Sequence, residues 1–269
     1  MKVAVIQLSA VGLSSDALRA YLRTCVKEGV SVVLLGEYLL NRFFKELEQT
    51  PLAMLREQSL HHIEALKNLS IEHNLTIVAP LVQIKGDKIF KTIVRFSPQR
   101  TFTYTQQLLI NYRHWNEEAF FANPIAPLHE PMHFKIDKFR FAVMGGFELH
   151  FDAMWSMVDA LGIDVVLLPT LSTFASHERW RNLIAMRAFT HHSYIVRANR
   201  IGEYQEPHTN VTWEFYGDSL VASPEGEIIE HLGNYEEVLI IELEKKALKE
   251  ARSWGFRDAI KTRSSSQQK

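Results

Sequence analysis

The chain has 269 residues, of which 46% are hydrophobic, and its 30 Lys and Arg residues nearly balance 31 Asp and Glu residues. A chain of this length and composition can bury a large core, so we expect a globular protein and not a disordered one. Because the formal net charge is −1, electrostatics give no reason to expect nucleic acid or an anionic membrane as a partner. A small neutral ligand is at least as compatible with this composition.

The N-terminal segment MKVAVIQLSAVG carries only a short apolar run. Such a run is too short for the hydrophobic region of a signal peptide or for a membrane span, so a cytoplasmic location is the default expectation. Cys25 is the only cysteine, which excludes an intramolecular disulfide and a cysteine-based zinc cluster. It shares the apolar stripe of a predicted helix with Leu18 and Leu22, where cysteine acts as a small, inert hydrophobe.

Strands and helices are predicted to alternate along the chain. Apolar runs predict strands at 2–8, 30–40, 75–84 and 88–97, and helical spacing predicts helices at 16–28 and 59–73. The segment 103–121 has no clear period. In the second half, strands are predicted at 139–148, 163–170 and 194–202, helices at 155–161 and 177–191, and a final strand and helix within 236–256. Continuous apolar strands of this kind form sheets covered by helices.

No linker rich in Pro, Gly or Ser divides the two halves of the chain. We therefore expect one α/β domain with two similar halves over residues 1–256. Residues 257–269 form a polar tail that we expect to be disordered.

Three places follow predicted strands, where loops of α/β proteins gather functional side chains. Glu37 ends the run VVLLGE, the segment TYTQQLLINYRHWNEEAFF (103–121) mixes polar and aromatic residues, and Gly145, Gly146 and Glu148 follow the strand FRFAV. A helix cap or surface glutamate would also explain Glu37, and an irregular connection would explain 103–121.

Several short segments carry a family resemblance in their order along the chain. They are KVAVIQL with Gln7, VVLLGEYLL with Glu37, RAFTHHSYIVRANRIG (187–202) and YGDSLVASPEGEII (216–229). Together they resemble the nitrilase superfamily, the carbon–nitrogen hydrolases, over nearly the whole chain. The resemblance implies a four-layer αββα sandwich, assembly into homodimers or larger homo-oligomers, and a small amide or nitrile as ligand. Neither a cofactor nor a metal is expected.

The superfamily mechanism uses a glutamate as general base, a cysteine thiolate as nucleophile, a lysine that stabilises the oxyanion, and a second glutamate that positions groups. Glu37 matches the base, and Glu117 matches the second glutamate by its spacing to an aromatic pair. Counting back from Glu117 places the lysine at Gln106, and counting back two residues from Glu148 places the cysteine at Gly146. The resemblance also implies that the substrate pocket is lined by Tyr112, Phe147, Glu148, Thr170 and Ser172.

Glycine offers no nucleophile, and a neutral glutamine lacks the charge of lysine. Three hypotheses follow: a catalytically impaired pseudoenzyme that binds a small molecule or partner, a hydrolase that uses Glu37 and water or another nucleophile, and an engineered inactive amidase. Thr190 stands where the family more often has glutamate, and this further departure favours natural divergence over engineering.

The same region also contains residues that suit other chemistry. Glu148, His150 and Asp152 would share one face of an extended strand, as metal ligands do, but the resemblance predicts a turn there. Thr170, Ser172 and Thr173 are candidate nucleophiles, although a polar loop after a strand needs no catalytic explanation. Trp115 and Trp180 could form an apolar pocket wall or ordinary core. The adjacent His191 and His192 make a poor ligand pair and fit a structural role better.

Overall fold

The computed structural model describes residues 1–12, 16–207 and 211–254. Its first large sheet has the order β16–β1–β2–β3–β4–β5. The strands are β1 (Lys2–Gln7), β2 (Val30–Leu35), β3 (Thr76–Lys85), β4 (Lys88–Phe96), β5 (Thr101–Thr105) and β16 (Glu237–Glu242). β1, β2 and β3 are parallel, and β16, β4 and β5 add antiparallel strands outside them.

The second large sheet repeats this plan with the order β15–β14–β11–β10–β9–β8. Its strands are β8 (Met132–Ile136), β9 (Phe139–Val143), β10 (Val165–Pro169), β11 (Tyr194–Ala198), β14 (Leu220–Ala222) and β15 (Ile228–His231). β9, β10 and β11 are parallel, with antiparallel strands on both sides. The prediction of two similar halves is therefore confirmed.

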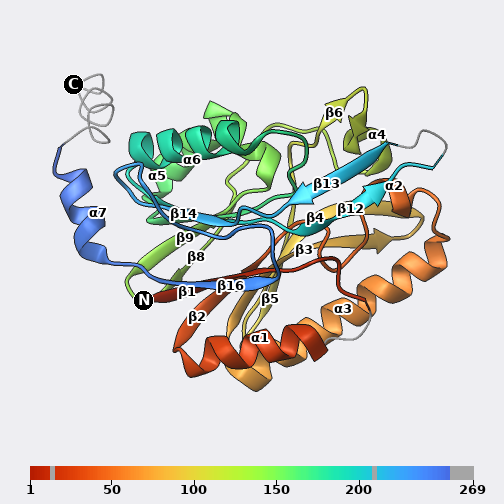
Figure 1. The fold of residues 1–269 in the computed structure, drawn as a ribbon, viewed down its shortest axis with the longest axis horizontal. Coiled ribbons are helices and arrows are strands. Elements are labelled where there is room, and N and C mark those ends of the chain that lie inside the picture. Colours follow the sequence, from red (N-terminus) through yellow and green to blue (C-terminus); the bar gives the residue numbers. More distant parts are fainter. Residues whose placement is uncertain (13–15, 208–210, 255–269) are drawn as a thin grey trace.

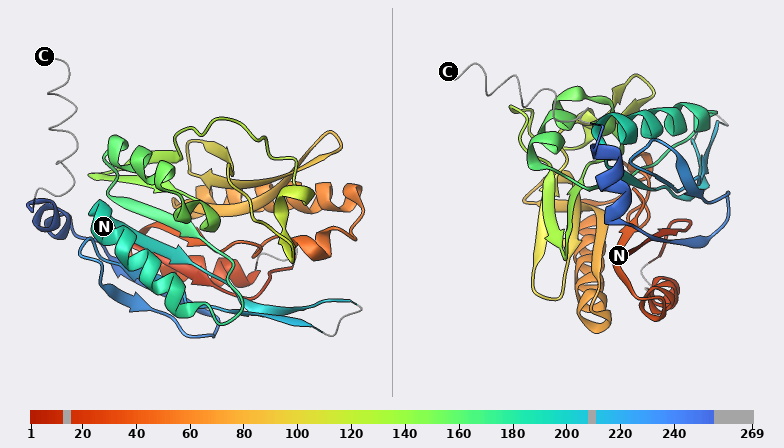
Figure 2. Two further views of the ribbon diagram at one scale, coloured as in Figure 1. Left: turned by 90° about the horizontal axis from the view of Figure 1, so that it is seen from above. Right: turned by 90° about the vertical axis from the view of Figure 1, so that its left-hand side faces the viewer.

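Helices cover the outer faces of both sheets (Figures 1 and 2). The first sheet carries α1 (Asp16–Lys27) and α3 (Leu52–His73), and the second carries α5 (Asp152–Leu161) and α6 (His177–His191). The short helices are α2 (Phe44–Leu47), α4 (Glu117–Phe120) and the 3₁₀ helix η1 (Gly146–His150). The pairs β6 (Asn111–Tyr112) with β7 (Trp115–Asn116), and β12 (Ile201–Gln205) with β13 (Thr212–Tyr216), form two-stranded sheets. α7 (Lys245–Arg252) lies at one end of the molecule (Figure 1).

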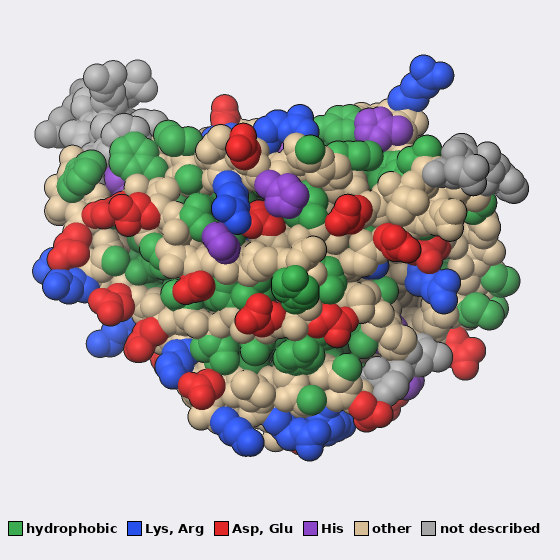
Figure 3. All heavy atoms as spheres, in the orientation of Figure 1, with side chains coloured by type: hydrophobic (Ala, Val, Ile, Leu, Met, Phe, Trp, Pro, Cys, Tyr) green, Lys and Arg blue, Asp and Glu red, His purple; other side chains and the backbone are tan. Residues whose placement is uncertain are grey.

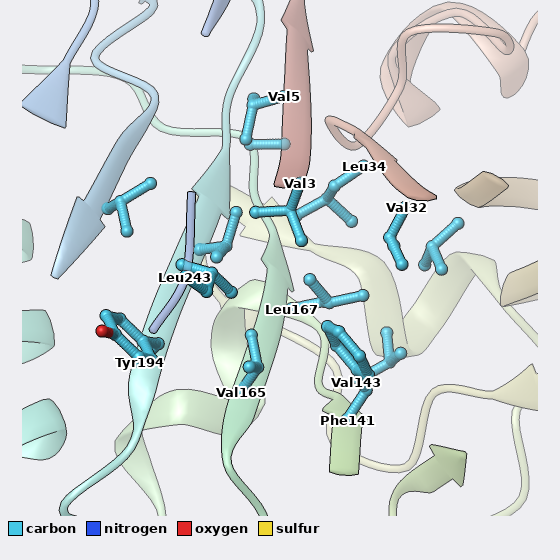
Figure 4. Packing of buried hydrophobic residues seen from close by; sticks show 14 of the residues in the cluster. Val3, Val5, Val32, Leu34, Phe141, Val143, Val165, Leu167, Tyr194 and Leu243 are labelled. Carbon is cyan, nitrogen blue, oxygen red and sulfur yellow. The ribbon is translucent and has the colours of Figure 1, made fainter. Parts of the chain in front are cut away.

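Three hydrophobic clusters fill the spaces between the four layers. The central cluster lies between the two sheets, where Val3 and Leu34 from one sheet pack with Val143 and Leu167 from the other (Figure 4). A second cluster joins the first sheet to α1 and α3, and a third joins the second sheet to α5 and α6. Strands buried on both faces explain the continuous apolar runs of the sequence. The four-layer αββα sandwich is confirmed.

Several strands of the structure end earlier than the apolar runs from which they were predicted. The run 30–40 leaves the sheet after Leu35, and the run 139–148 leaves it after Val143. At the second point Glu148 donates its backbone N–H to the carbonyl of Gly145, which bends the chain into η1. The predicted helix 59–73 begins earlier, at Leu52, directly after Pro51. A proline fits the start of a helix because its missing N–H would have no partner there.

Within the described residues, no helix combines the length and apolarity that crossing a membrane requires. Figure 3 shows acidic and basic side chains interspersed on the face that it displays. The polar tail expected at 257–269 lies outside the described residues.

Candidate functional site

Glu37 lies where the two sheets meet, directly after β2. Its backbone N–H donates to the carbonyl of Thr170, which follows β10 in the other sheet, at 3.1 Å. Gly36 makes this approach close, because a Cβ there would lie 3.0 Å from the carbonyl carbon of Asn199. Glu37 is only 4% exposed, and Oε1 of its carboxylate accepts a 3.3 Å hydrogen bond from the backbone N–H of Gly146. Glu37 and Gly146, two residues that the family resemblance assigns to one site, are therefore in contact.

Glu117 approaches the same place from the start of α4. Its N–H donates to the carbonyl of Ile110 at 2.7 Å, while Asn116 caps the helix through the N–H of Ala119. The carboxylate of Glu117 is fully buried and accepts a 2.6 Å hydrogen bond from the hydroxyl of Tyr38. The local turn thus delivers a second buried carboxylate to the site.

Lys91 joins the two carboxylates, and sequence reasoning missed it. Its Nζ lies 3.1 Å from Oε2 of Glu37 and 2.9 Å from both carboxylate oxygens of Glu117. Lys91 is 4% exposed and sits in the middle of β4. A lysine within the apolar strand KIFKTIVRF is a signal that could have been used, because buried lysines are almost always paired. We call Glu37, Lys91 and Glu117 the buried charge cluster.

The buried charge cluster changes the acidity of its members. Burial raises the pKa of Glu37 to about 7, with a further increase from the Glu117 charge that Lys91 only partly offsets. Burial lowers the pKa of Lys91, but the two carboxylates outweigh it, so this pKa is raised overall. Burial and the neighbouring carboxylates also raise the pKa of Tyr38 well above its ordinary value, so its hydroxyl is a neutral donor. Glu37 is consequently poised to gain or lose a proton near neutral pH.

Gln106, at the position expected for the lysine, is fully buried, and its side chain does not contact Glu37 or Glu117 through any hydrogen bond among the described residues. Its Nε2 donates to the carbonyl of Leu108 at 2.9 Å, and its Oε1 has no hydrogen-bond partner. The side chain fills the space beside Gly145, since a Cβ on that glycine would lie 2.5 Å from Cδ of Gln106. The cation that contacts Glu37 and Glu117 therefore comes from β4 and not from position 106.

Gly146, the position expected for the thiol, lies against Thr170. A Cβ on Gly146 would be 3.0 Å from Cγ2 of Thr170 and 3.4 Å from the carbonyl oxygen of Pro169. The hydroxyl of Thr170 points elsewhere: it donates to the carbonyl of Ala198 and accepts from Arg197. The methyl group, not the hydroxyl, therefore faces Gly146.

Glu148 organises the loop that carries Gly146. Its carboxylate accepts hydrogen bonds from the Tyr104 hydroxyl at 2.8 Å and from the backbone N–H groups of Gln107 and Gly145 at 2.7 Å. Burial raises the pKa of Glu148, and these three donors partly offset the increase. With its acceptors occupied in this way, Glu148 acts as a structural anchor.

A cavity of about 590 Å³ opens beside this region and contains three of the five residues expected for the substrate pocket, Tyr112, Phe147 and Ser172. Glu148 and Thr170 do not line the cavity, and their polar groups are used in the contacts above. Trp115 and Trp180 line the cavity wall. The buried charge cluster does not line it; Glu37 and Lys91 instead border a separate space of about 10 Å³.

The alternative sites receive little support from the geometry. Among the described residues, no group of three or more His, Cys, Asp and Glu side chains is placed to hold a metal. Cys25 is buried in the cluster between the first sheet and its helices, and burial raises the pKa of its thiol to about 11.

The two adjacent histidines have separate environments. His191 pairs with Asp159 at 2.8 Å, while His192 is buried at the end of α6. Ser172 accepts a 2.6 Å hydrogen bond from Arg197.

Comparisons with known proteins agree with this architecture. The family model described as carbon-nitrogen hydrolase matches residues 2–253. The chain is 22% identical to an N-carbamoylputrescine amidase of Oryza sativa subsp. japonica, over 96% of this chain and 91% of that one.

Two solved structures show the same fold. A carbon-nitrogen hydrolase from Helicobacter pylori G27 has a TM-score of 0.83 at 16% identity, covering 96% of this chain and 94% of that one. A mutant of the amidase from Nesterenkonia sp. AN1, with acrylamide added at its active-site cysteine, has a TM-score of 0.76 at 19% identity, covering 96% and 99%. The family match spans nearly the entire chain, and the chain therefore belongs to the carbon–nitrogen hydrolases of the nitrilase superfamily.

Proposed function

We propose that this protein binds a small amide-like molecule on a carbon–nitrogen hydrolase fold without forming a covalent intermediate. The observation that carries the proposal is glycine at position 146, where the family resemblance places the thiol. Covalent catalysis by this family's route needs a nucleophilic atom next to the general base. At this position the chain offers Glu37 only a backbone N–H, at 3.3 Å.

The contacts of Lys91 support the same proposal. Three hydrogen bonds to Glu37 and Glu117 use the donors of its ammonium group. An oxyanion would have to compete with two carboxylates for this cation. The buried charge cluster therefore suits a structural role better than the stabilisation of a transition state. The larger cavity next to it remains suited to a ligand, since small-molecule sites commonly enclose about 300–1,000 Å³.

Intact-protein mass spectrometry tests this proposal. The purified protein would be incubated with short amides, nitriles and N-carbamoyl compounds, then quenched in acid so that any ester or thioester survives. We expect the unmodified mass throughout. An acyl adduct at any residue in the region of Glu37 would overturn the proposal. A Cys25→Ser variant is the matched control that separates adventitious labelling of the single thiol from chemistry at the site.

A second candidate is hydrolysis by direct attack of water. It is favoured by the pKa of Glu37, about 7, which suits a general base at neutral pH. Glu37 would take a proton from water, the water oxygen would attack the amide carbon, and the C–N bond would break as the amine leaves with that proton. The space of about 10 Å³ beside Glu37 and Lys91 has room for at most one water.

Under this second candidate, turnover would occur without an adduct. It would rise with pH through about 7 as Glu37 loses its proton, and it would disappear in Glu37→Gln. Turnover with this pH–rate profile would therefore favour the second candidate, because binding alone predicts none.

A further inference from the structure

The larger cavity has an aromatic wall. Trp180, Phe147 and Phe174 contribute to its lining, together with Tyr112. The rings of Tyr112 and Phe147 meet edge to face, with centroids 5.9 Å apart. Aromatic walls of this kind accept flat, apolar groups through stacking and edge contacts. The shape of the lining therefore favours a ligand with a planar apolar body.

The lining of this cavity carries a positively charged side chain. Arg179 lines it, and no Asp or Glu is present among the described residues of the lining. Arg179 is exposed and has no ion pair or hydrogen bond with other described residues. Its guanidinium is therefore available to a ligand, and guanidinium groups bind carboxylates through two parallel hydrogen bonds.

A second positive group stands behind the aromatic wall. The guanidinium of buried Arg197 lies 5.0 Å from the ring centre of Trp180. Arg197 shares one carboxylate, that of Asp218, with Arg181, at 3.1 and 2.6 Å. Two guanidinium groups on one carboxylate leave a net positive charge beneath the cavity, which adds to the attraction for an anion.

The lining also includes an unpaired polar group. The hydroxyl of Thr173 is buried and has no hydrogen-bond partner, although the residue borders the cavity and is only 4% exposed. A buried polar group without a partner costs free energy. Rotation of the Thr173 side chain toward a bound acceptor, such as an amide oxygen, would remove that cost.

We propose that this cavity selects small amides that carry a carboxylate and a flat apolar group, with the carboxylate against Arg179 and the flat group against Trp180 and Phe147. The inference rests on the proposed function for the amide part of the ligand. The preference for an anion rests on the cavity itself.

Three matched probes test the inference. N-benzoylglycine, N-benzoylglycinamide and N-benzoylethylenediamine share the ring and the amide but end in a carboxylate, a neutral amide and an ammonium group. Binding would be measured by isothermal titration calorimetry at pH 7.5 and low salt. We expect the carboxylate to bind about tenfold more tightly than the neutral probe, as a charge-assisted hydrogen bond allows, and the ammonium probe to bind weakest.

Variants then locate the preference. Arg179→Gln should weaken binding of the carboxylate about tenfold and leave the neutral probe within about twofold, because only the charged end meets this residue. Arg23→Gln, which changes an exposed arginine of α1 on the opposite layer, is the matched control and should leave all three affinities unchanged. Thr173→Val should weaken all three probes by a similar factor, because they share the amide.

The inference is overturned if none of the probes binds, if the ammonium probe binds as tightly as the carboxylate, or if Arg179→Gln weakens all three equally. Release of benzoate in the same solutions is followed separately by chromatography. Benzoate release would refute the proposed function of binding alone while leaving the charge preference standing, so the two failures are distinguishable.

Discussion

Gln106 and Lys91 are hydrogen-bonded neighbours at the edge of the first sheet: the backbone N–H of Gln106 donates to the carbonyl of Lys91 at 3.2 Å. Gln106 stands at the position expected for the family lysine, whereas Lys91 supplies the ammonium group between Glu37 and Glu117. The cation of the site therefore comes from β4, whereas the position expected for the lysine follows the neighbouring strand β5.

Replacing Lys91 by methionine should strongly destabilise the protein. Two buried carboxylates would lose their shared cation, and breaking a buried ion pair costs about 3–5 kcal/mol. Urea denaturation at pH 7.5 measures the loss. Lys88→Met is the matched control, because Lys88 is exposed on the same strand and should change stability by less than about 0.5 kcal/mol. Equal losses in the two variants would show that the cluster contributes little.

Replacing Glu37 by glutamine should alter how stability depends on pH. The pKa of Glu37 is raised to about 7 from the ordinary glutamate value of 4.5, so between these values the folded protein binds more protons than the unfolded chain. This group therefore makes wild-type stability fall as the pH rises from about 4.5 to about 7. Glu37→Gln removes that loss, so its stability relative to wild type should improve between pH 5 and pH 8.

Urea unfolding at both pH values checks this result. Glu57→Gln, on an exposed position of α3, should track wild type at each pH. A constant offset between Glu37→Gln and wild type from pH 5 to pH 8 would contradict the raised pKa.

Gly145 and Gln106 should be energetically coupled. Gly145→Ala places a methyl group 2.5 Å from Cδ of Gln106, and overpacking of this kind costs about 1–3 kcal/mol. In Gly145→Ala with Gln106→Ala the methyl group has room, so the double variant should be more stable than the sum of the single changes predicts. A double-mutant cycle from urea denaturation gives the coupling, and strict additivity would contradict the contact.

Much of the fold could be predicted because the apolar runs and helical spacings are long and regular. The helix α6 was predicted with the limits that the structure shows, His177–His191. The errors gather at strand ends: β2 stops at Leu35 and β9 at Val143, although apolar residues continue beyond both. Hydrogen bonds made outside the sheets, such as that from Glu37 to Thr170, end these strands, and no periodicity records them.

The family resemblance assigned Glu37, Glu117 and Gly146 to one site, and hydrogen bonds link Glu37 to the other two through Lys91 and the Gly146 N–H. Motif order does not give the pairing between distant segments. Lys91 stands out as a lysine within an apolar strand, but its partners Glu37 and Glu117 belong to segments far away in the sequence, so no local pattern pairs them. Arg197 was missed for the same reason, because its partner Asp218 belongs to a distant segment.

Ammonia release from a panel of short amides, nitriles and N-carbamoyl compounds, with wild-type protein and Glu37→Gln compared at pH 8, distinguishes binding from hydrolysis at this site. At this pH wild-type Glu37 is mostly ionised, since its pKa is about 7. We predict that wild type releases no more ammonia than Glu37→Gln, because the site lacks a nucleophile beside its general base. Ammonia release by wild type that disappears in Glu37→Gln would show that the protein hydrolyses its ligand, contrary to this prediction.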